Sequence, residues 1–305
     1  MSHPYASEAY VGGLAHIGVP FAVPEWGGHV LVRPTPCGTR EDAAGPYPLT
    51  VMTPDADVAA GLARLRAAGL VAVVLVLDDR LRPPMALLTG ATATLRRFKS
   101  HHVHDRSLGP FAYGKHHRYE IRRARTRVTV AEITLADHLP DWERLYGQLT
   151  ARHGLGGLHG FSSGHHAMLA GLPGVRAFAA FVEDRLVSAH LFVTHDGHAM
   201  SHLAASSAEG YQTGAAYAVN DLALDELSDC GVINFGGGAG TGDDLADGLV
   251  RFKKGFSNSL EPSYLFSAIL DDDAYAALSA GHADTGFFPA YRGPRQQERS
   301  DEHQG

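Results

Sequence analysis

The sequence predicts a protein of the α/β (α+β) class with two subdomains, each a mixed, mostly antiparallel sheet flanked by helices. Apolar residues at helical spacing over 55–69 are followed at once by the apolar run 70–77, which predicts a helix and then a buried strand. Apolar segments between residues 175 and 205 are separated by tight turns, which predicts an antiparallel meander. With 305 residues, 45% of them hydrophobic, the chain can bury one large core or two modest ones.

The first half of the chain is the less regular one. Its first fifty residues are rich in Gly and Pro, and the alternating run 29–33 predicts a strand there. Residues 91–98 alternate like a further strand, and residues 135–152 carry an apolar stripe typical of a helix. A basic segment, 115–127, lies between them.

The second half predicts a regular order of elements. Its meander strands are 175–182, 186–194 and 199–205, and a turn of small residues then opens a helix that ends near Asp229. A short strand at 232–235 and the glycine loop 236–242 come next. Another helix and a last strand at 264–270 complete the order. We expect an N-terminal subdomain over 1–110, a C-terminal subdomain over 111–290 and a loose charged tail over 291–305.

Composition excludes several classes of protein. The net charge of −7 argues against a protein that coats nucleic acid, although a net value does not exclude a local basic patch. Cys37 and Cys230 are too few for a disulfide framework, and we expect free thiols. The longest apolar run is far shorter than the roughly 20 residues of a membrane helix, so we expect a cytoplasmic protein without membrane insertion. The oligomeric state is left open.

Two glycine-containing segments are candidates for substrate binding. The small residues of 210–216 precede a helix, where the backbone NH groups of Gly214 and Ala215 would face an anion; a plain turn is the alternative. The loop 236–242, with Gly236 and Gly237 at its start, fits neither the Walker template nor GxGxxG. It is interpreted as an active-site wall, with a flexible surface loop as the alternative.

Cations occur near that loop and in the basic segment. Lys253 follows Phe252, and its ammonium suits a phosphate or the oxyanion of a tetrahedral intermediate, although surface Lys is common. The basic segment 115–127 places several residues in a row suited to the phosphates of RNA or of a phosphorylated ligand. A solvated helix face is the alternative. The residues of this predicted row are Lys115, His117, Arg118, Arg122 and Arg125.

Two further motifs favour other chemistries only weakly. Residues 160–164 match GxSxG around Ser162, but no buried strand precedes the serine as a nucleophile elbow requires. His101, His102 and His104 are close enough in sequence to ligate zinc, but no Cys or second His cluster completes a site. No metal site is predicted.

The order of elements resembles the GNAT acyltransferase fold, and more specifically the FemABX branch of aminoacyl-tRNA-dependent transferases, built of two GNAT-like subdomains. The resemblance spans roughly residues 55 to 270 and depends on several short segments. These are 114–124, Leu145-Tyr146 with Arg152-His153, His202 to Ser206, the helix 211–227, Ile233 to Gly237, and Phe252-Lys253 before Gly255-Phe256.

This resemblance implies roles that the residues alone leave open. It places the acyl donor end or the oxyanion at Lys253, and makes the glycine loop a wall of the acyl channel. His202 and Tyr211 are candidates for positioning the nucleophile. The acyl donor is a co-substrate, and no tightly bound cofactor is expected.

The predicted function is transfer of an activated acyl group to an amine. The usual acyl-CoA signature is imperfect here, because Gln212 leads to Ala215 rather than Gly and Tyr217 stands where a small residue is expected. We therefore expect aminoacyl-tRNA as the donor and a small molecule, such as a natural-product intermediate, or a peptide as the acceptor. The alternatives are an acyl-CoA-dependent N-acetyltransferase and a non-catalytic RNA-binding or peptide-binding protein of the same fold.

Overall fold

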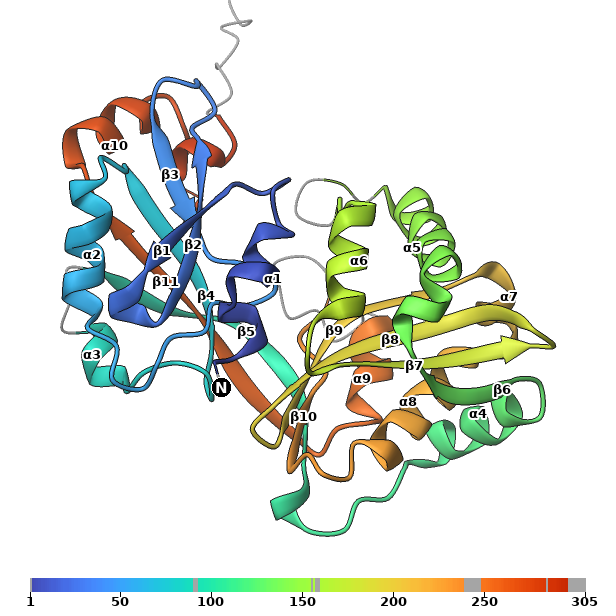
Figure 1. Ribbon diagram of the computed structural model, residues 1–305. Coiled ribbons are helices and arrows are strands. Elements are labelled where there is room, and N and C mark those ends of the chain that lie inside the picture. The colour runs from blue at the N-terminus through green and yellow to red at the C-terminus, as the bar shows by residue number, and fades with distance from the viewer. Residues whose placement is uncertain are drawn as a thin grey trace, which may run out of the picture. The chain divides into compact units, whose positions relative to one another are not determined.

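The structure is a computed structural model that describes residues 2–89, 93–154, 156, 160–238, 248–283 and 285–295 (Figure 1). It divides into two compact units that interleave along the chain. Unit 1 consists of Met1–Ile17 and Arg97–Tyr264, and unit 2 of Gly18–Arg96 and Leu265–Gly305. The chain therefore enters unit 2 after its first 17 residues and returns to it at its end.

Unit 1 is built on a mixed sheet in the order β11-β5-β10-β9-β8-β7-β6. Strands β6 (Thr129–Ile133), β7 (Val175–Val182), β8 (Arg185–His195) and β9 (His198–Ser206) are joined antiparallel. The short strand β10 (Val232–Asn234) pairs parallel with β9 and antiparallel with β5 (Thr94–Asp105), most of which belongs to this unit. The first part of β11 (Ser259–Ile269) lies beside β5.

The predicted meander is confirmed, and its turns have the expected chemistry. Glu183, Asp196 and Gly197 adopt positive φ values of 53°, 47° and 73°, the conformation that tight hairpin turns require and that Asp and Gly tolerate well. The predicted strand 91–98 is longer than expected, because pairing with β10 extends it to Asp105.

Helices cover both faces of this sheet (Figure 1). One face carries α5 (Leu139–His153) and α6 (Ser163–Gly171), with η1 (Pro4–Ala6), α1 (Glu8–Gly12) and η4 (Leu135–His138) packed nearby. The other face carries α4 (Lys115–Arg125), α8 (Ala215–Glu226) and α9 (Gly248–Lys254), and the short helix α7 (Ala208–Thr213) connects β9 to α8. η3 (Arg106–Leu108) follows β5.

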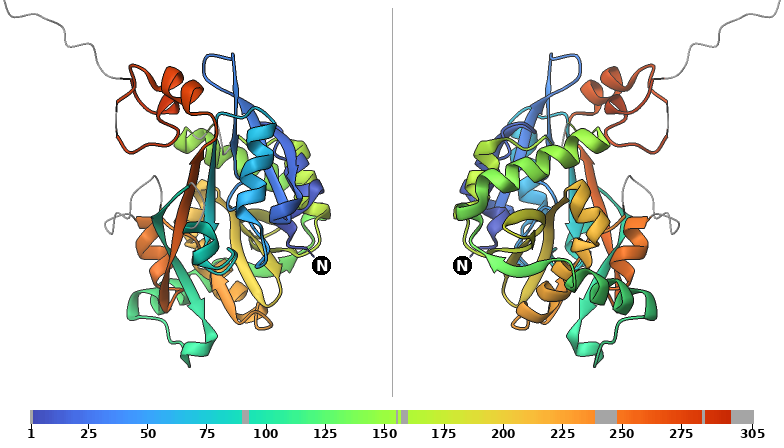
Figure 2. Two further views of the ribbon diagram at one scale, coloured as in Figure 1. Left: turned by 90° about the vertical axis from the view of Figure 1, so that its left-hand side faces the viewer. Right: turned by 90° about the vertical axis from the view of Figure 1, so that its right-hand side faces the viewer.

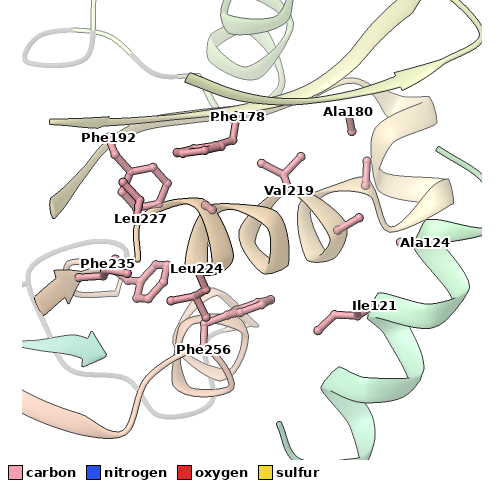
Figure 3. Close-up of a cluster of buried hydrophobic side chains, with 14 of the residues drawn as sticks. Ile121, Ala124, Phe178, Ala180, Phe192, Val219, Leu224, Leu227, Phe235 and Phe256 are labelled. Atoms are coloured by element: carbon pink, nitrogen blue, oxygen red, sulfur yellow. The ribbon is translucent and has the colours of Figure 1, made fainter. Parts of the chain in front are cut away.

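The core beneath β7 and β8 is apolar, and α8 crosses it with Val219 toward the sheet (Figure 3). Phe178 and Phe192 project from the strands toward α8, with Phe192 beside Leu227, while Phe235 and Phe256 close the end of the core near β10. Burial of these rings fixes α8 and the residues after α9 against the same face of the sheet.

Unit 2 has the strand order β1-β2-β3-β4-β11. Strands β1 (Val19–Val23), β2 (Gly28–Pro34) and β3 (Glu41–Ala44) are antiparallel, and α2 (Val58–Ala67) connects β3 to the parallel β4 (Ala72–Asp78). The predicted helix and buried strand at 55–77 are thus confirmed. The remaining elements are η2 (Pro24–Trp26), α3 (Met85–Thr89), α10 (Asp272–Ser279) and η6 (Ala290–Arg292).

One glycine of unit 2 is required by packing. A Cβ on Gly61 of α2 would lie 2.0 Å from the Trp26 ring nitrogen, so only glycine lets this buried ring press against the helix. The left view of Figure 2 shows α2 beside the strands of unit 2. The fold class predicted from the sequence is confirmed, and residues 296–305 of the predicted tail lie outside the described residues.

Candidate active site

Strands β9 and β10 separate soon after they pair. Their ladder runs from His198↔Val232 to Met200↔Asn234 and ends there, although β9 continues to Ser206. The chain after β10 stays with β5 instead, because Phe235 N donates to His102 O at 2.8 Å and His102 N donates to Gly236 O at 3.0 Å. A split therefore opens in the sheet of unit 1 between β9 and the segment after β10.

A bulge in β9 lies at the same position. Leu191 of β8 faces Leu203, but Phe192 faces Ser201, so His202 is an extra residue without a partner on β8. Bulges bend a strand and redirect side chains. Ser201 and His202 are consequently presented beside the split and on opposite faces of the sheet, as their contacts below show.

Lys253 of α9 reaches the segment that leaves the split. Its Nζ donates to the Gly237 carbonyl oxygen at 2.6 Å, and Lys99 of β5 donates to the next carbonyl, Gly238 O, at 3.1 Å. Gly236 has a φ of 74°, and a Cβ there would lie 3.6 Å from Lys253 Nζ. The structure thus brings together Gly236, Gly237 and Lys253, and residues 239–242 of the predicted loop lie outside the described residues.

A polar chain runs behind the split on the α8 face. Ser201 Oγ lies 2.7 Å from His190 Nε2, and His190 Nδ1 lies 3.0 Å from Asn220 Oδ1. Asn220 Nδ2 donates to Ala216 O at 2.8 Å. Burial lowers the pKa of His190 to about 3; the hydrogen bond to Asn220 opposes that shift, and the charge of Lys253 adds to it.

The opposite face holds a cluster of buried aromatic and imidazole rings. His202 Nδ1 lies 3.2 Å from the Tyr5 hydroxyl, and its ring centroid is 6.1 Å from that of His165. His165 Nδ1 lies 3.1 Å from Gly13 O, and its ring stacks on Phe161 at 4.4 Å. Burial lowers the pKa of His165 to about 4 and places that of His202 well below its usual range.

The predicted anion seat at the start of α8 lies close to a carboxylate. Gly214 has a φ of 73° and precedes Ala215, the first residue of the helix, without a side-chain cap. A Cβ on Gly214 would lie 3.7 Å from Glu120 Oε2 of α4, so a carboxylate already stands at the positive end of the helix. The Tyr217 ring packs on Phe252 with centroids 4.9 Å apart.

Only part of the predicted basic row is available to a ligand. Arg125 is paired with Asp221, and Arg123 with Glu120. Within the described ranges, Lys115, Arg118 and Arg122 have no carboxylate partner, and all three are exposed. Among the described residues, the exposed, unpaired part of the predicted row therefore consists of Lys115, Arg118 and Arg122.

The structure buries His117 instead of exposing it with Arg118 and Arg122. Its Nε2 lies 2.9 Å from Phe252 O, and a Cβ on Gly255 would lie 2.0 Å from its ring. Because a carbonyl oxygen only accepts, this nitrogen donates the bond. His117 joins α4 to α9 and thereby holds the end of the helix that carries Lys253.

Tyr211 lies apart from these residues. Its side chain is 56% exposed, and the Arg152 guanidinium stands 4.6 Å above its ring. The structure thus unites Lys253, Phe252, Gly236 and Gly237 on one face and places His202 on the other.

The two minor motifs form no catalytic centre in the described part of the chain. Ser162 caps α6, with His165 N donating to its Oγ at 3.2 Å. The described residues directly before it, Gly160 and Phe161, are not in a strand. His101 lies 3.1 Å from Asn234 Nδ2, while His104 packs on Phe111. Within the described residues no group of three or more His, Cys, Asp or Glu is placed to hold a metal ion.

Sequence reasoning missed Ser201, His190, Asn220 and Lys99. Ser201 and His190 stand in strands that read as apolar, and Asn220 stands within a helix of small residues. The one available signal was a polar residue at a core-facing position of a strand, which became interpretable only once the register was known.

Comparison with known proteins identifies the fold. No family model matches the chain, and no curated protein matches it. FemX matches with a TM-score of 0.59 and 12% identity over 82% of this chain and 86% of its own. A C-terminal DUF2156 domain from Agrobacterium fabrum matches with a TM-score of 0.59 and 16% identity over 82% of this chain and 83% of its own. L-PGS from Bacillus licheniformis matches with a TM-score of 0.55 and 14% identity over 87% of this chain and 92% of its own.

These structures show that the chain has the fold of FemX and L-PGS. The FemABX-like fold predicted from the sequence is confirmed. No helix within the described ranges is both long enough and apolar enough to cross a membrane.

Proposed function

We propose that the protein is an N-acyltransferase that moves an activated acyl group, aminoacyl from aminoacyl-tRNA, onto an amine of a small molecule or peptide. The observation that carries this proposal is the split between β9 and β10, with the Lys253 ammonium at the segment that leaves it. The shared fold with FemX and L-PGS supports the same class of reaction.

The residues at the split suit the chemistry. Aminolysis of an ester is downhill, so the protein needs to align the two substrates and to stabilise the negative charge that develops on the carbonyl oxygen. Lys253 supplies a positive charge where the strands part, and the glycines around Gly237 allow a linear acyl group to approach the backbone.

Two observations favour tRNA over acyl-CoA as the donor. The carboxylate of Glu120, which is also paired with Arg123, already stands at the start of α8, where a phosphate group of acyl-CoA would have to lie. Lys115, Arg118 and Arg122 form an exposed row of cations on α4, which suits a nucleic-acid backbone. The acyl-CoA-dependent reaction remains the alternative that the experiment tests.

The experiment offers the purified protein tRNA charged with labelled amino acids or labelled acetyl-CoA, each with a pool of small amines and peptides. We expect the charged tRNA to lose its label to an amine faster than it does without protein, and the acetyl-CoA to keep it. Transfer from acetyl-CoA but not from charged tRNA would show that the donor is acyl-CoA and not aminoacyl-tRNA. Transfer from neither would favour a non-catalytic RNA-binding or peptide-binding protein.

A further inference from the structure

In the hydrogen-bond chain of Asn220, His190 and Ser201, the bond between Asn220 and Ala216 determines which group donates and which accepts at each step. Asn220 Nδ2 donates to Ala216 O at 2.8 Å, and a carbonyl oxygen only accepts. The Asn220 oxygen therefore faces His190, whose Nδ1 must carry the hydrogen of that 3.0 Å bond. His190 Nε2 is then the acceptor, and Ser201 donates its hydroxyl hydrogen to it over 2.7 Å.

This direction leaves the oxygen of Ser201 as an acceptor. Its one hydrogen is committed to His190, while its lone pairs receive no hydrogen bond from the residues that the structure describes. Ser201 directly follows Met200, the last residue of β9 that pairs with β10, and its side chain is only partly buried. The acceptor oxygen therefore stands where the sheet has opened, on the same face as Lys253.

The same three residues have the geometry of a nucleophile, a base and an orienting group, but their surroundings oppose that role. Attack by Ser201 on an acyl donor would pass its proton to His190 and create an imidazolium. His190 is buried, Asn220 brings no negative charge, and the Lys253 ammonium lies nearby. Each of these features disfavours an imidazolium, so the hydroxyl keeps its proton on the bond to His190.

We propose that Ser201 Oγ accepts a hydrogen bond from an N–H of a primary amine on the substrate and so selects and orients amine-bearing substrates at the split. The proposal depends on the proposed function for the location of the substrate. The amine has two sources with the same chemistry, namely the α-amino group of an aminoacyl donor and the attacking amine of the acceptor. An acyl group without an amine leaves the oxygen unsatisfied, which disfavours its binding.

The kinetic experiment compares Ser201→Ala with wild type on alanyl-tRNA and on propionyl-tRNA, which lacks only the amino group. We expect Ser201→Ala to lower kcat/KM for alanyl-tRNA about tenfold. If propionyl-tRNA is unaffected, the amine belongs to the donor; if both donors lose equally, it belongs to the acceptor. Unchanged kcat/KM for both donors would overturn the proposal. Ser201→Thr, which keeps a hydroxyl, should restore most of the activity.

Two controls separate this role from a structural one. Ser188→Ala removes a buried hydroxyl bonded to Ser206 at 2.8 Å in the same sheet, and it should leave kcat/KM for both donors unchanged. His190→Phe removes the group that holds the Ser201 hydrogen, so it should lower kcat/KM for the same donors as Ser201→Ala does, without further loss in the double variant. Additive losses in the double variant would contradict the shared chain.

A binding measurement keeps the inference independent of turnover. Puromycin carries a free α-amine beside a nucleoside, and its desamino analogue lacks that group. Calorimetry should show wild type binding puromycin about tenfold more tightly than the analogue, and Ser201→Ala should bind both alike. Equal binding of the two probes by wild type, or binding of neither, would count against the proposal for the donor amine even if acyl transfer is found. An acyl adduct on Ser201 in the intact mass spectrum would show a nucleophile and overturn the assignment.

Discussion

The two units bury polar groups in different ways. In unit 2 the fully buried Asp42 carboxylate accepts from Arg33 at 2.8 Å, from Arg292 at 2.6 and 3.1 Å and from the Tyr291 hydroxyl at 2.9 Å. In unit 1 the buried groups near the split are neutral, and their chain ends at the open oxygen of Ser201. Unit 2 holds a charge whose partners surround it, whereas unit 1 leaves an acceptor for something else.

This difference separates a structural role from a functional one. A buried charge is tolerated only with partners, and those of Asp42 come from β2 and from the C-terminal segment, so the carboxylate ties that segment to the sheet of unit 2. A neutral chain with an unused acceptor contributes less to stability and remains available to a ligand. Substitutions in the two groups should therefore change different quantities.

The largest expected effect is on stability, from Asp42→Ala. Its removal leaves the partly buried side chains of Arg33 and Arg292 without their carboxylate partner, which should lower the free energy of unfolding by about 3 kcal/mol. Denaturant titration measures this. Asp141→Ala, at an exposed pair with Arg144, should cost less than about 1 kcal/mol. A loss for Asp42→Ala as small as that for Asp141→Ala would contradict the structural role.

Lys253→Ala should affect activity rather than stability. Loss of one group that stabilises an oxyanion typically costs about 10² to 10³ in kcat. Acyl transfer from charged tRNA measures the effect, and Lys254→Ala, the exposed neighbour on the same helix, is the control. Equal activity of Lys253→Ala and Lys254→Ala would show that Lys253 does not stabilise the oxyanion.

The neutral histidines of unit 1 should make the protein sensitive to acid. The pKa values of His165 and His190 lie at about 4 and about 3, so the unfolded chain binds protons below about pH 6.5 that the folded chain does not. Stability is then present above pH 6.5 and is lost as pH falls toward 4, by about 1.4 kcal/mol per pH unit for each residue.

Denaturant titrations at pH 7, 6 and 5 test this pH dependence. His165→Gln should lower its slope by about 1.4 kcal/mol per pH unit between pH 6 and 5, since one buried imidazole is removed. The exposed His153→Gln should not change it. A slope that is the same in His165→Gln and in wild type would show that His165 is protonated in the folded state.

The smallest of these effects concerns the α4 row. Arg118→Ala with Arg122→Ala should weaken tRNA binding about tenfold and reduce the slope of log affinity against log salt by about 2, because two phosphate contacts are lost. Arg123→Ala with Arg125→Ala is the matched control, since these residues already pair with Glu120 and Asp221. An equal loss of tRNA affinity in both double variants would show that only the net charge of α4 matters and that Arg118 and Arg122 do not contact the phosphates.

Sequence reasoning predicted the fold better than the site. The meander, the helix before β4 and the glycine segment after β10 all follow from local periodicity and turn chemistry, which depend on residues near one another in the chain. Lys253 was reached through its motif beside Phe252. The sequence does not distinguish Arg118 from Arg125 as a phosphate ligand. Only the packing of α4 against α8 shows that Asp221 pairs with Arg125.

By itself the sequence determined which segments are helices and strands, since apolar spacing and turn residues act over a few positions. Only the tertiary structure decided that β9 parts from β10 after Met200 and that a bulge sets Ser201 and His202 on opposite faces. It also joined Ser201 to His190 and Asn220, which lie 11 and 19 residues away along the chain. The physical reason is that strand register and helix packing set which distant polar groups meet, and these depend on the burial of the whole core.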